Sequence, residues 1–224
     1  MLGIVVGLEA EGRIARCLGR VAIGGGLPAG AEAAAEELVA HGVTALISFG
    51  LAGGLDPALP AGTLVVPEMV IEDGRHYLTD PALSARFGIP TTRSVLAGHT
   101  ILSDPAAKHA ARAATGAAII DLESGAVARV AARHNLPFAV LRAVCDPARR
   151  ALPPLALAAL DAGGRIGPGR VIAALLRHPG QIPALLGLAR DAMRARAALM
   201  AAVRRIPHHR QASGAGTASV RLPE

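Results

Sequence analysis

Two carboxylates lie near the ends of the stretch DLESGAVARVAARHNLPFAVLRAVCD (121–146), which reads as a short helix, a turn and a buried strand. Glu123 stands at the helix start and Asp146 at the strand end. Packing alone does not explain why an acid such as Asp146 lies among apolar neighbours. A partly desolvated carboxyl group has a raised pKa and can donate a proton. Glu123 has a plainer explanation too, because an acid at a helix start interacts favourably with the helix dipole, and Asp121 could cap that helix.

Glycine clusters follow two other expected strands. GLAGGL (50–55) comes after VTALISFG (43–50), and Gly24–Gly26 come after RVAI. Backbone N–H groups of such segments can approach an anionic ligand closely, although an ordinary turn between strand and helix would also contain glycine. Because the chain lacks the dinucleotide fingerprint and the P-loop lysine, NAD and ATP binding are disfavoured.

Strands alternate with helices along the chain. We expect strands at 2–6, 20–26, 43–50, 63–74 (extended, bent at Pro67), 117–121 and 137–146, and helices from about residue 9, at 29–42, at 104–115 and at 122–135. This alternation predicts an α/β fold whose mainly parallel sheet is covered by helices on both faces. Ligands of such sheets bind beyond the carboxyl ends of the strands, so Gly50–Gly54 and Asp146 should lie together.

Composition narrows the class of protein. The chain has 224 residues, 52% of them hydrophobic and only 2% aromatic, with 23 basic residues against 17 acidic. The positive charge is almost all arginine, since Lys108 is the only lysine. It is compatible with an anionic membrane or a phosphate-bearing substrate, or with a coding bias towards arginine; without a dense basic run we expect no nucleic-acid partner. Cys17 and Cys145 form no metal-binding pattern, so no metal is expected.

The chain is predicted to be a single domain at 1–206, in which 147–206 form a helical C-terminal extension, followed by a disordered tail at 207–224. The N-terminus has no basic region, and the apolar runs are shorter than the ~18 residues of a membrane span, so a cytoplasmic protein is expected. Within the extension, the following residues approximate one apolar helical stripe: Ile182, Leu185, Leu186, Ala189, Met193, Met200 and Val203. The stripe could pack on the sheet, or part of 171–205 could contact an anionic bilayer.

Three motifs, in order, resemble the nucleoside phosphorylase and nucleosidase superfamily that includes methylthioadenosine/adenosylhomocysteine nucleosidase. They are GLEAEG (7–12), GLAGGLDPALPAGTLVV (50–66) and the stretch 121–146 quoted above. Within the superfamily, EDGRHYLTD (72–80), LESGAVAR and the arginine-rich extension look most like the hopanoid-associated phosphorylase. The resemblance implies a three-layer fold with a mostly parallel mixed sheet and cleavage of an adenine N-glycosidic bond.

The resemblance also implies roles for single residues. Asp146 matches the general acid that protonates N7 of the purine, and Glu123 matches the carboxylate that holds the ribose hydroxyls. Glu11 matches the base that activates water, and Arg142 matches an arginine beside the nucleophile. The other substrate-binding residues implied by the resemblance are Leu122, Ala52, Gly53, Gly25 and Ser103.

Departures from the family pattern leave the nucleophile open. Leu51 stands where the hydrolases usually have Ser or Thr, Ala106 and Ala107 replace an aromatic, and Cys145 replaces a Ser. No cofactor is implied, although inorganic phosphate could be a co-substrate. The resemblance implies adenosylhopane as the preferred substrate. The alternatives are a methylthioadenosine or other small-nucleoside enzyme and a non-catalytic nucleoside-binding protein. The resemblance further implies a homo-oligomer.

Overall fold

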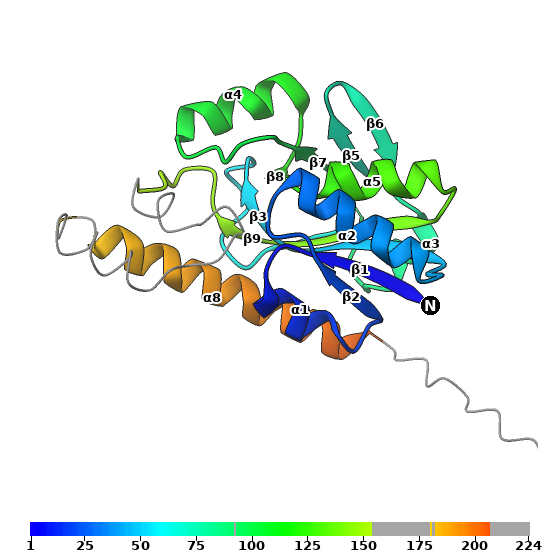
Figure 1. Ribbon diagram of the computed structural model, residues 1–224. Coiled ribbons are helices and arrows are strands. Elements are labelled where there is room, and N and C mark those ends of the chain that lie inside the picture. Colours follow the sequence, from blue (N-terminus) through cyan, green and yellow to red (C-terminus); the bar gives the residue numbers. More distant parts are fainter. Residues whose placement is uncertain (92, 154–179, 181, 207–224) are drawn as a thin grey trace, which may run out of the picture.

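The computed structural model describes residues 1–91, 93–153, 180 and 182–206 (Figure 1). The strands in these residues form one nine-stranded sheet. They are β1 (Leu2–Val6), β2 (Arg20–Ile23), β3 (Ala45–Gly54), β4 (Leu64–Val65), β5 (Met69–Glu72), β6 (Arg75–Leu78), β7 (Ser94–Ala97), β8 (Ile119–Asp121) and β9 (Phe138–Asp146). The helices are α1 (Glu9–Ala15), α2 (Pro28–Ala40), α3 (Pro81–Ala85), α4 (Pro105–Thr115), α5 (Ser124–Arg133) and α8 (Ile182–Arg205).

The sheet is mixed and mostly parallel, as the resemblance implied. Its main path runs β2-β1-β3-β8-β7-β5-β6, while β9 pairs with β3 and with β4. The pairs β1·β2, β1·β3, β3·β9, β5·β7 and β7·β8 are parallel, and β3·β8, β4·β9 and β5·β6 are antiparallel. Strand β3 therefore lies at the centre, between β1 and β9.

Helices cover both faces of the sheet. Successive residues of a strand point to opposite sides, so each strand contributes to both cores. In β1, Val5 packs in the core under α2 and α5, whereas Ile4 and Val6 pack in the core under α1, α3 and α8. In β9, Val140 faces the first core and Leu141 the second. Figure 1 shows α2 and α5 on one side of the strands, α8 and α1 on the other, and α4 apart from both layers.

The glycine-rich segment after Gly50 continues the strand, so the predicted end of that strand at Gly50 was wrong. Strand β3 extends to Gly54, four residues beyond the predicted end. The backbone pairing that keeps it extended comes from two neighbours, since β9 pairs with β3 as far as Gly53 and β8 pairs with Gly53 and Gly54. The register with β9 shifts between Ala52 and Gly53, because Cys145 of β9, next to Asp146, has no partner residue on β3.

Short elements between residues 75 and 97 were missed. β6, β7 and α3 have four or five residues each, too few for a hydrophobic period to show. A cap signal for α3 was nevertheless present: Asp80 precedes Pro81, and its Oδ1 accepts a hydrogen bond from Leu83 N at 2.6 Å. The same pattern at Asp104 and Pro105 correctly predicted α4.

The apolar stripe predicted for the C-terminal helix is not the buried face of α8. Ile182, Leu186, Met193 and Met200 are 40–60% exposed. The buried residues of α8 are Asp191, Ala195, Leu199, Ala202 and Val203, of which only Val203 belongs to the predicted stripe. The large apolar residues Ile182, Leu186, Met193 and Met200 lie on the exposed side of the helix.

Parts of the predicted domain layout lie outside the described residues: most of 147–181, and the tail at 207–224. The boundary of a single domain at 206 therefore stays a prediction. No helix among the described residues is both long and apolar enough to cross a membrane.

Candidate active site

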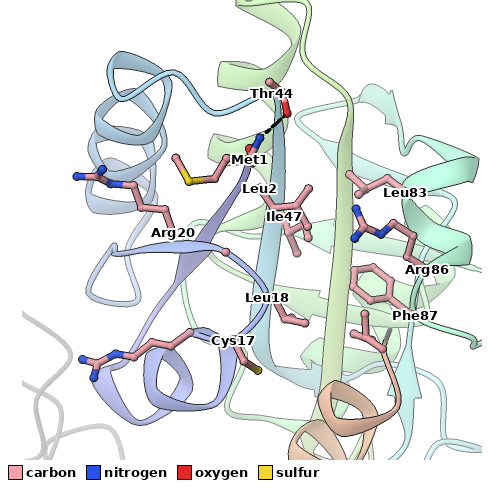
Figure 2. A pocket seen from close by; sticks show the side chains of 13 residues that line it. Met1, Leu2, Cys17, Leu18, Arg20, Thr44, Ile47, Leu83, Arg86 and Phe87 are labelled. Atoms are coloured by element: carbon pink, nitrogen blue, oxygen red, sulfur yellow. Dashed lines mark hydrogen bonds between the residues drawn. The ribbon is translucent and has the colours of Figure 1, made fainter. Parts of the chain in front are cut away.

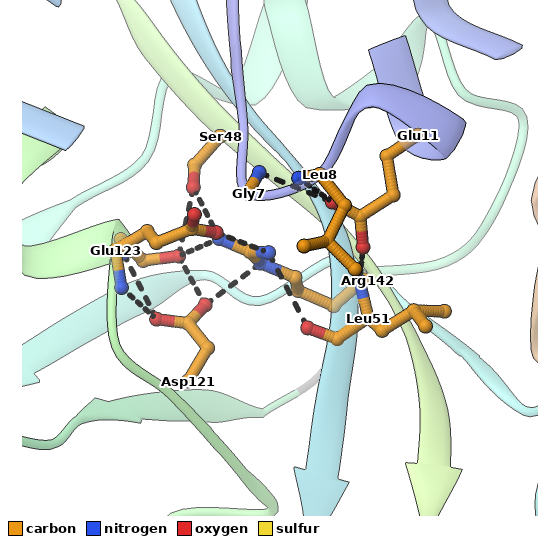
Figure 3. Close-up of polar contacts among 9 residues, drawn as sticks. Gly7, Leu8, Glu11, Ser48, Leu51, Asp121, Glu123 and Arg142 are labelled. Atoms are coloured by element: carbon orange, nitrogen blue, oxygen red, sulfur yellow. Dashed lines mark hydrogen bonds and ion pairs between the residues drawn. The ribbon is translucent and has the colours of Figure 1, made fainter. Parts of the chain in front are cut away.

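Arg142 of β9 lies at the centre of a buried polar cluster (Figure 3). Its side chain is 1% exposed, and its three nitrogens all face oxygen atoms. Nε lies 2.7 Å from Asp121 Oδ2, Nη1 donates to Glu123 Oε2 at 3.0 Å, and Nη2 donates to Ser48 Oγ at 2.6 Å. Nη1 also reaches Leu51 O at 3.3 Å and Nη2 reaches Ser124 Oγ at 3.4 Å. The guanidinium thus ties β9 to β3, β8 and the start of α5.

The charge of Arg142 is maintained by its acidic neighbours. Burial, the largest single influence, disfavours the cation, but Asp121, Glu123 and Glu11 together outweigh it and raise the pKa of Arg142. A buried arginine surrounded by carboxylates is therefore a fixed cation in this site.

Glu11 lies at the first turn of α1 and is held by backbone amides. Its Oε2 accepts from Gly7 N at 3.1 Å and Leu8 N at 2.9 Å, and its Oε1 accepts from Leu51 N at 3.0 Å. Burial nevertheless raises the pKa of Glu11, against the lowering influence of Arg142 and these amides. A Cβ at Gly50, whose φ is +154°, would lie 2.9 Å from Glu11 Oε1 and 2.8 Å from Arg142 Nη1. Because glycine has no Cβ, the side chains of Glu11 and Arg142 can both lie against the backbone of β3 at position 50.

Glu123 immediately precedes α5 and has one oxygen without a partner. Arg142 holds Oε2, but Oε1 is buried and accepts no hydrogen bond from the described residues. Burial, reinforced by Glu11 and Asp121, raises the pKa of Glu123 to about 7. An unpaired buried acceptor costs about 1–3 kcal/mol, so this oxygen suits a hydrogen-bond donor from outside the described residues, such as a ligand.

Asp146 ends β9 and repeats this arrangement. Its Oδ2 accepts from Lys108 Nζ at 2.5 Å, whereas its Oδ1 is buried and has no hydrogen-bond partner in the described parts of the chain. Burial raises the pKa of Asp146, and Lys108 opposes that rise. Gly53 lies opposite Asp146 in the register of β3 and β9, so the glycine-rich strand and the acid do lie together.

Lys108 is the residue that sequence reasoning missed. It comes from α4 and is fully buried. The available signal was that Lys108 is the only lysine of the chain, since a lysine used once among many arginines suggests a specific role for that position.

Cys145 is not suited to be a nucleophile. Burial, helped by the charges of Asp146 and Glu11, raises the pKa of its thiol to about 12. The thiolate is the reactive form of cysteine, so this side chain stays protonated at neutral pH.

The remaining predicted site residues are Ala52, Leu122, Gly25 and Ser103. Ala52 lies in β3 beside Gly53, and Leu122 separates Asp121 from Glu123. Gly25 follows β2 with a left-handed φ of +74°. The carbonyl of Ser103 accepts a hydrogen bond from Leu152 N at 2.8 Å. Among the described contacts, nothing joins Gly25 or Ser103 to the three carboxylates.

A hollow of about 730 Å³ lies at the opposite edge of the sheet, where β1 and β3 begin (Figure 2). Apolar side chains such as Leu18, Leu83 and Phe87 line it together with Arg20 and Arg86, and no acidic residue does. Because ligands of parallel sheets bind at the carboxyl ends of the strands, the carboxylate edge is the stronger candidate for an active site. The described residues contain no cluster of three His, Cys, Asp or Glu side chains that could hold a metal ion.

Solved structures share this fold. S-adenosylhomocysteine nucleosidase from Streptococcus pyogenes, in complex with 5-methylthiotubericidin, matches with a TM-score of 0.66 at 18% identity, over 92% of this chain and 97% of that one. Futalosine hydrolase of Helicobacter pylori strain 26695 matches with a TM-score of 0.65 at 16% identity, over 91% and 97% of the two chains. A 5′-methylthioadenosine/S-adenosylhomocysteine nucleosidase from Colwellia psychrerythraea, in complex with adenine, matches with a TM-score of 0.61 at 16% identity, over 90% and 95%.

These identities are low enough that the likeness concerns the fold alone. A search among curated proteins finds no significant match. The family model of the phosphorylase superfamily, however, matches residues 18–161, which is more than half of the chain and includes β3, α5 and β9. With the fold and the match in agreement, the chain belongs to the phosphorylase superfamily.

Proposed function

We propose that this protein cleaves the adenine N-glycosidic bond of a 5′-substituted adenosine. One observation carries the proposal: Glu123 and Asp146 are buried carboxyls that each have one oxygen bound by a cation and one oxygen without a partner. Two such oxygens at one sheet edge suit a substrate with donors on its sugar and a protonatable nitrogen on its base.

The two carboxyls would act at the two ends of the bond that breaks. Asp146, in its protonated form, gives its proton to N7 of adenine while the electron pair of the C1′–N9 bond moves into the purine. The ribose develops oxocarbenium character, as in glycoside hydrolysis. Ionised Glu123 accepts hydrogen bonds from the ribose hydroxyls and stabilises that positive charge.

We propose water as the nucleophile. Phosphate would need cationic or backbone N–H donors, but both Nη atoms of Arg142 already donate to Glu123, Ser48, Ser124 or Leu51, and its Nε forms an ion pair with Asp121. Glu11 has three amides on its two oxygens, and a carboxylate has room for about four such bonds. The remaining position can accept a proton from water as it attacks C1′.

For the 5′-substituent we propose a large apolar group, by resemblance hopane. The support is the surface of α8, where four large apolar residues are exposed beside exposed arginines: Ile182, Leu186, Met193, Met200, Arg190, Arg194, Arg204 and Arg205. Such a face suits contact with an anionic bilayer, from which a lipid-linked nucleoside would come.

We also propose a homo-oligomer and a cytoplasmic location. A small nucleoside such as methylthioadenosine remains the alternative substrate.

Adenine release from the purified protein tests the proposal. Adenosylhopane, methylthioadenosine and adenosine are supplied separately, with and without phosphate, and the products are separated by chromatography. We expect adenine and the free sugar, in amounts that do not depend on phosphate. A sugar phosphate would identify phosphorolysis, and tight nucleoside binding without adenine release would identify a binding protein.

A further inference from the structure

The lysine on α4 is placed to control the acid at the end of β9. Lys108 Nζ donates to Asp146 Oδ2 at 2.5 Å, to Arg150 O at 3.0 Å and to Pro147 O at 3.3 Å. An ammonium group has three N–H donors, and here each has an acceptor. The lysine therefore has no donor left for a substrate, and its effect on a reaction must pass through Asp146.

The contact divides the two oxygens of Asp146. Lys108 binds Oδ2, so that the carboxyl cannot rotate without breaking a buried charge-assisted hydrogen bond. Oδ1 is left as the only oxygen able to carry a proton to a ligand, and it has no other partner within the described residues. The clamp thus fixes which oxygen is the donor and the direction in which it points.

The contact also opposes the effect of burial. Burial favours the neutral acid, which would be a weak proton donor, whereas the ammonium favours the carboxylate that remains after the proton has left. The other charged or titratable groups near Asp146 are Arg150 after β9, Asp191 on α8 and the neighbouring Cys145. Lys108 is the only one of them that the structure shows hydrogen-bonded to the carboxyl.

We propose that Lys108 is a positioning residue that clamps Oδ2 of Asp146, directs Oδ1 to the leaving base and stabilises the carboxylate formed when the proton is transferred. This inference rests on the proposed function, because it takes Asp146 as the acid. When Asp146 protonates N7, the proton leaves Oδ1, the negative charge spreads over both oxygens, and Lys108 neutralises it without giving up a proton of its own.

Arg112 provides a matched control one helical turn further along α4. Its Nη1 lies 3.0 Å from Asp56 Oδ2, so it forms an ion pair between α4 and the segment after β3. Arg112→Gln removes a charge and a helix contact from α4 but leaves the clamp on Asp146 in place.

The test compares Lys108→Met with wild type and with Arg112→Gln. For Lys108→Met we expect the alkaline limb of the pH–rate profile for adenine release to move up by ~1–3 pH units, the usual effect of losing a cation beside a carboxylate, and the maximal rate to fall. Arg112→Gln should leave that limb where it is. An unmoved limb in an active Lys108→Met enzyme overturns the proposal.

A second measurement does not depend on activity. With aspartate labelled at its side-chain carboxyl carbon, NMR follows the titration of Asp146, assigned by the signal that Asp146→Asn removes. Lys108→Met should move this titration to higher pH, and an unchanged titration overturns the clamp even if the protein releases no adenine. Lys108→Gln, which keeps hydrogen-bond donors without the charge, serves the same two measurements if Lys108→Met does not fold. A wild-type protein without adenine release would count against the proposed function alone.

Discussion

A Cβ placed on Gly7 would lie 2.6 Å from Oε1 of Glu123, the carboxylate oxygen that has no partner. The backbone after β1 therefore forms a wall against which this carboxylate rests, and only glycine leaves enough room.

Gly7→Ala should accordingly displace Glu123 and lower the rate of adenine release by ~10-fold or more, since small misplacements of site groups have large kinetic costs. Gly12→Ala is the matched control, because its Cβ would meet nothing closer than Val21 Cγ1 at 3.4 Å and it lies in α1. That control should keep its activity and gain up to about 1 kcal/mol of stability. Equal rates in the two variants would show that Gly7 does not position the carboxylate.

Asp146→Asn should lower turnover by ~10²–10⁴-fold, the usual contribution of a general acid. Its neighbour gives the comparison: Cys145→Ser should keep turnover, because a protonated thiol has no part in the chemistry. Circular dichroism checks that both variants fold. Adenine release by Asp146→Asn at the wild-type rate would remove Asp146 from the role of acid.

Glu11→Gln should lower the rate to a similar extent in any buffer, because an amide cannot take a proton from attacking water. The measurement is single-turnover adenine release in buffers with and without phosphate. Activity that survives in the variant and rises in proportion to phosphate would instead identify phosphate as the nucleophile.

Glu123 should make the free energy of unfolding depend on pH. Its pKa rises from an ordinary 4.5 to about 7 in the folded protein, so between these values the folded state holds a proton that the unfolded state has lost. The contribution is present below pH 4.5 and is lost as pH rises through 7, at about 1.4 kcal/mol per pH unit. Urea unfolding at pH 5, 6 and 7 should therefore show a smaller decline in Glu123→Gln than in wild type. Parallel curves would mean that Glu123 titrates normally.

The exposed face of α8 should bind anionic vesicles at low salt. Each arginine near such a surface contributes about 1 kcal/mol, and salt screens it. Co-sedimentation with phosphatidylserine-containing vesicles should weaken in Arg190→Gln/Arg204→Gln more than in a control that removes two exposed arginines elsewhere, Arg75→Gln/Arg149→Gln. Wild-type protein that stays in the supernatant at low salt would exclude a membrane-docking role for α8.

Sequence patterns predicted the layers of the fold because the long strands are apolar runs and the helices have cap signals such as Asp104 and Pro105 or Gly42. Strand β9 and helices α2 and α4 begin and end within two residues of their predicted limits. Strand β3 was cut short because its glycines signal a turn locally, while the pairing that keeps them extended comes from strands distant in the sequence. The face of α8 was misassigned for a related reason, since the side of a helix that is buried depends on its contacts with distant strands.

The sequence named the carboxylates and Arg142 as candidate site residues, but it gave neither Lys108 nor the contacts that join these groups. Nothing local in the sequence joins Lys108 to Asp146, which is 38 residues away, and nothing in the composition shows that Arg142 is enclosed rather than open to a ligand. Pairings of this kind depend on how helices and strands meet, so they required the structure.

The enclosure of Arg142 also bears on how this site could evolve. Each Nη–H withdrawn from Glu123 or Ser48 to bind an incoming anion would leave a buried acceptor without that donor. A descendant that changed its nucleophile by mutation would need a new cation at another position, and the first such change would have to arise while the old arginine stayed in place. A change of nucleophile would therefore alter residues other than Arg142, and the contacts of Arg142 that join the strands would stay in place.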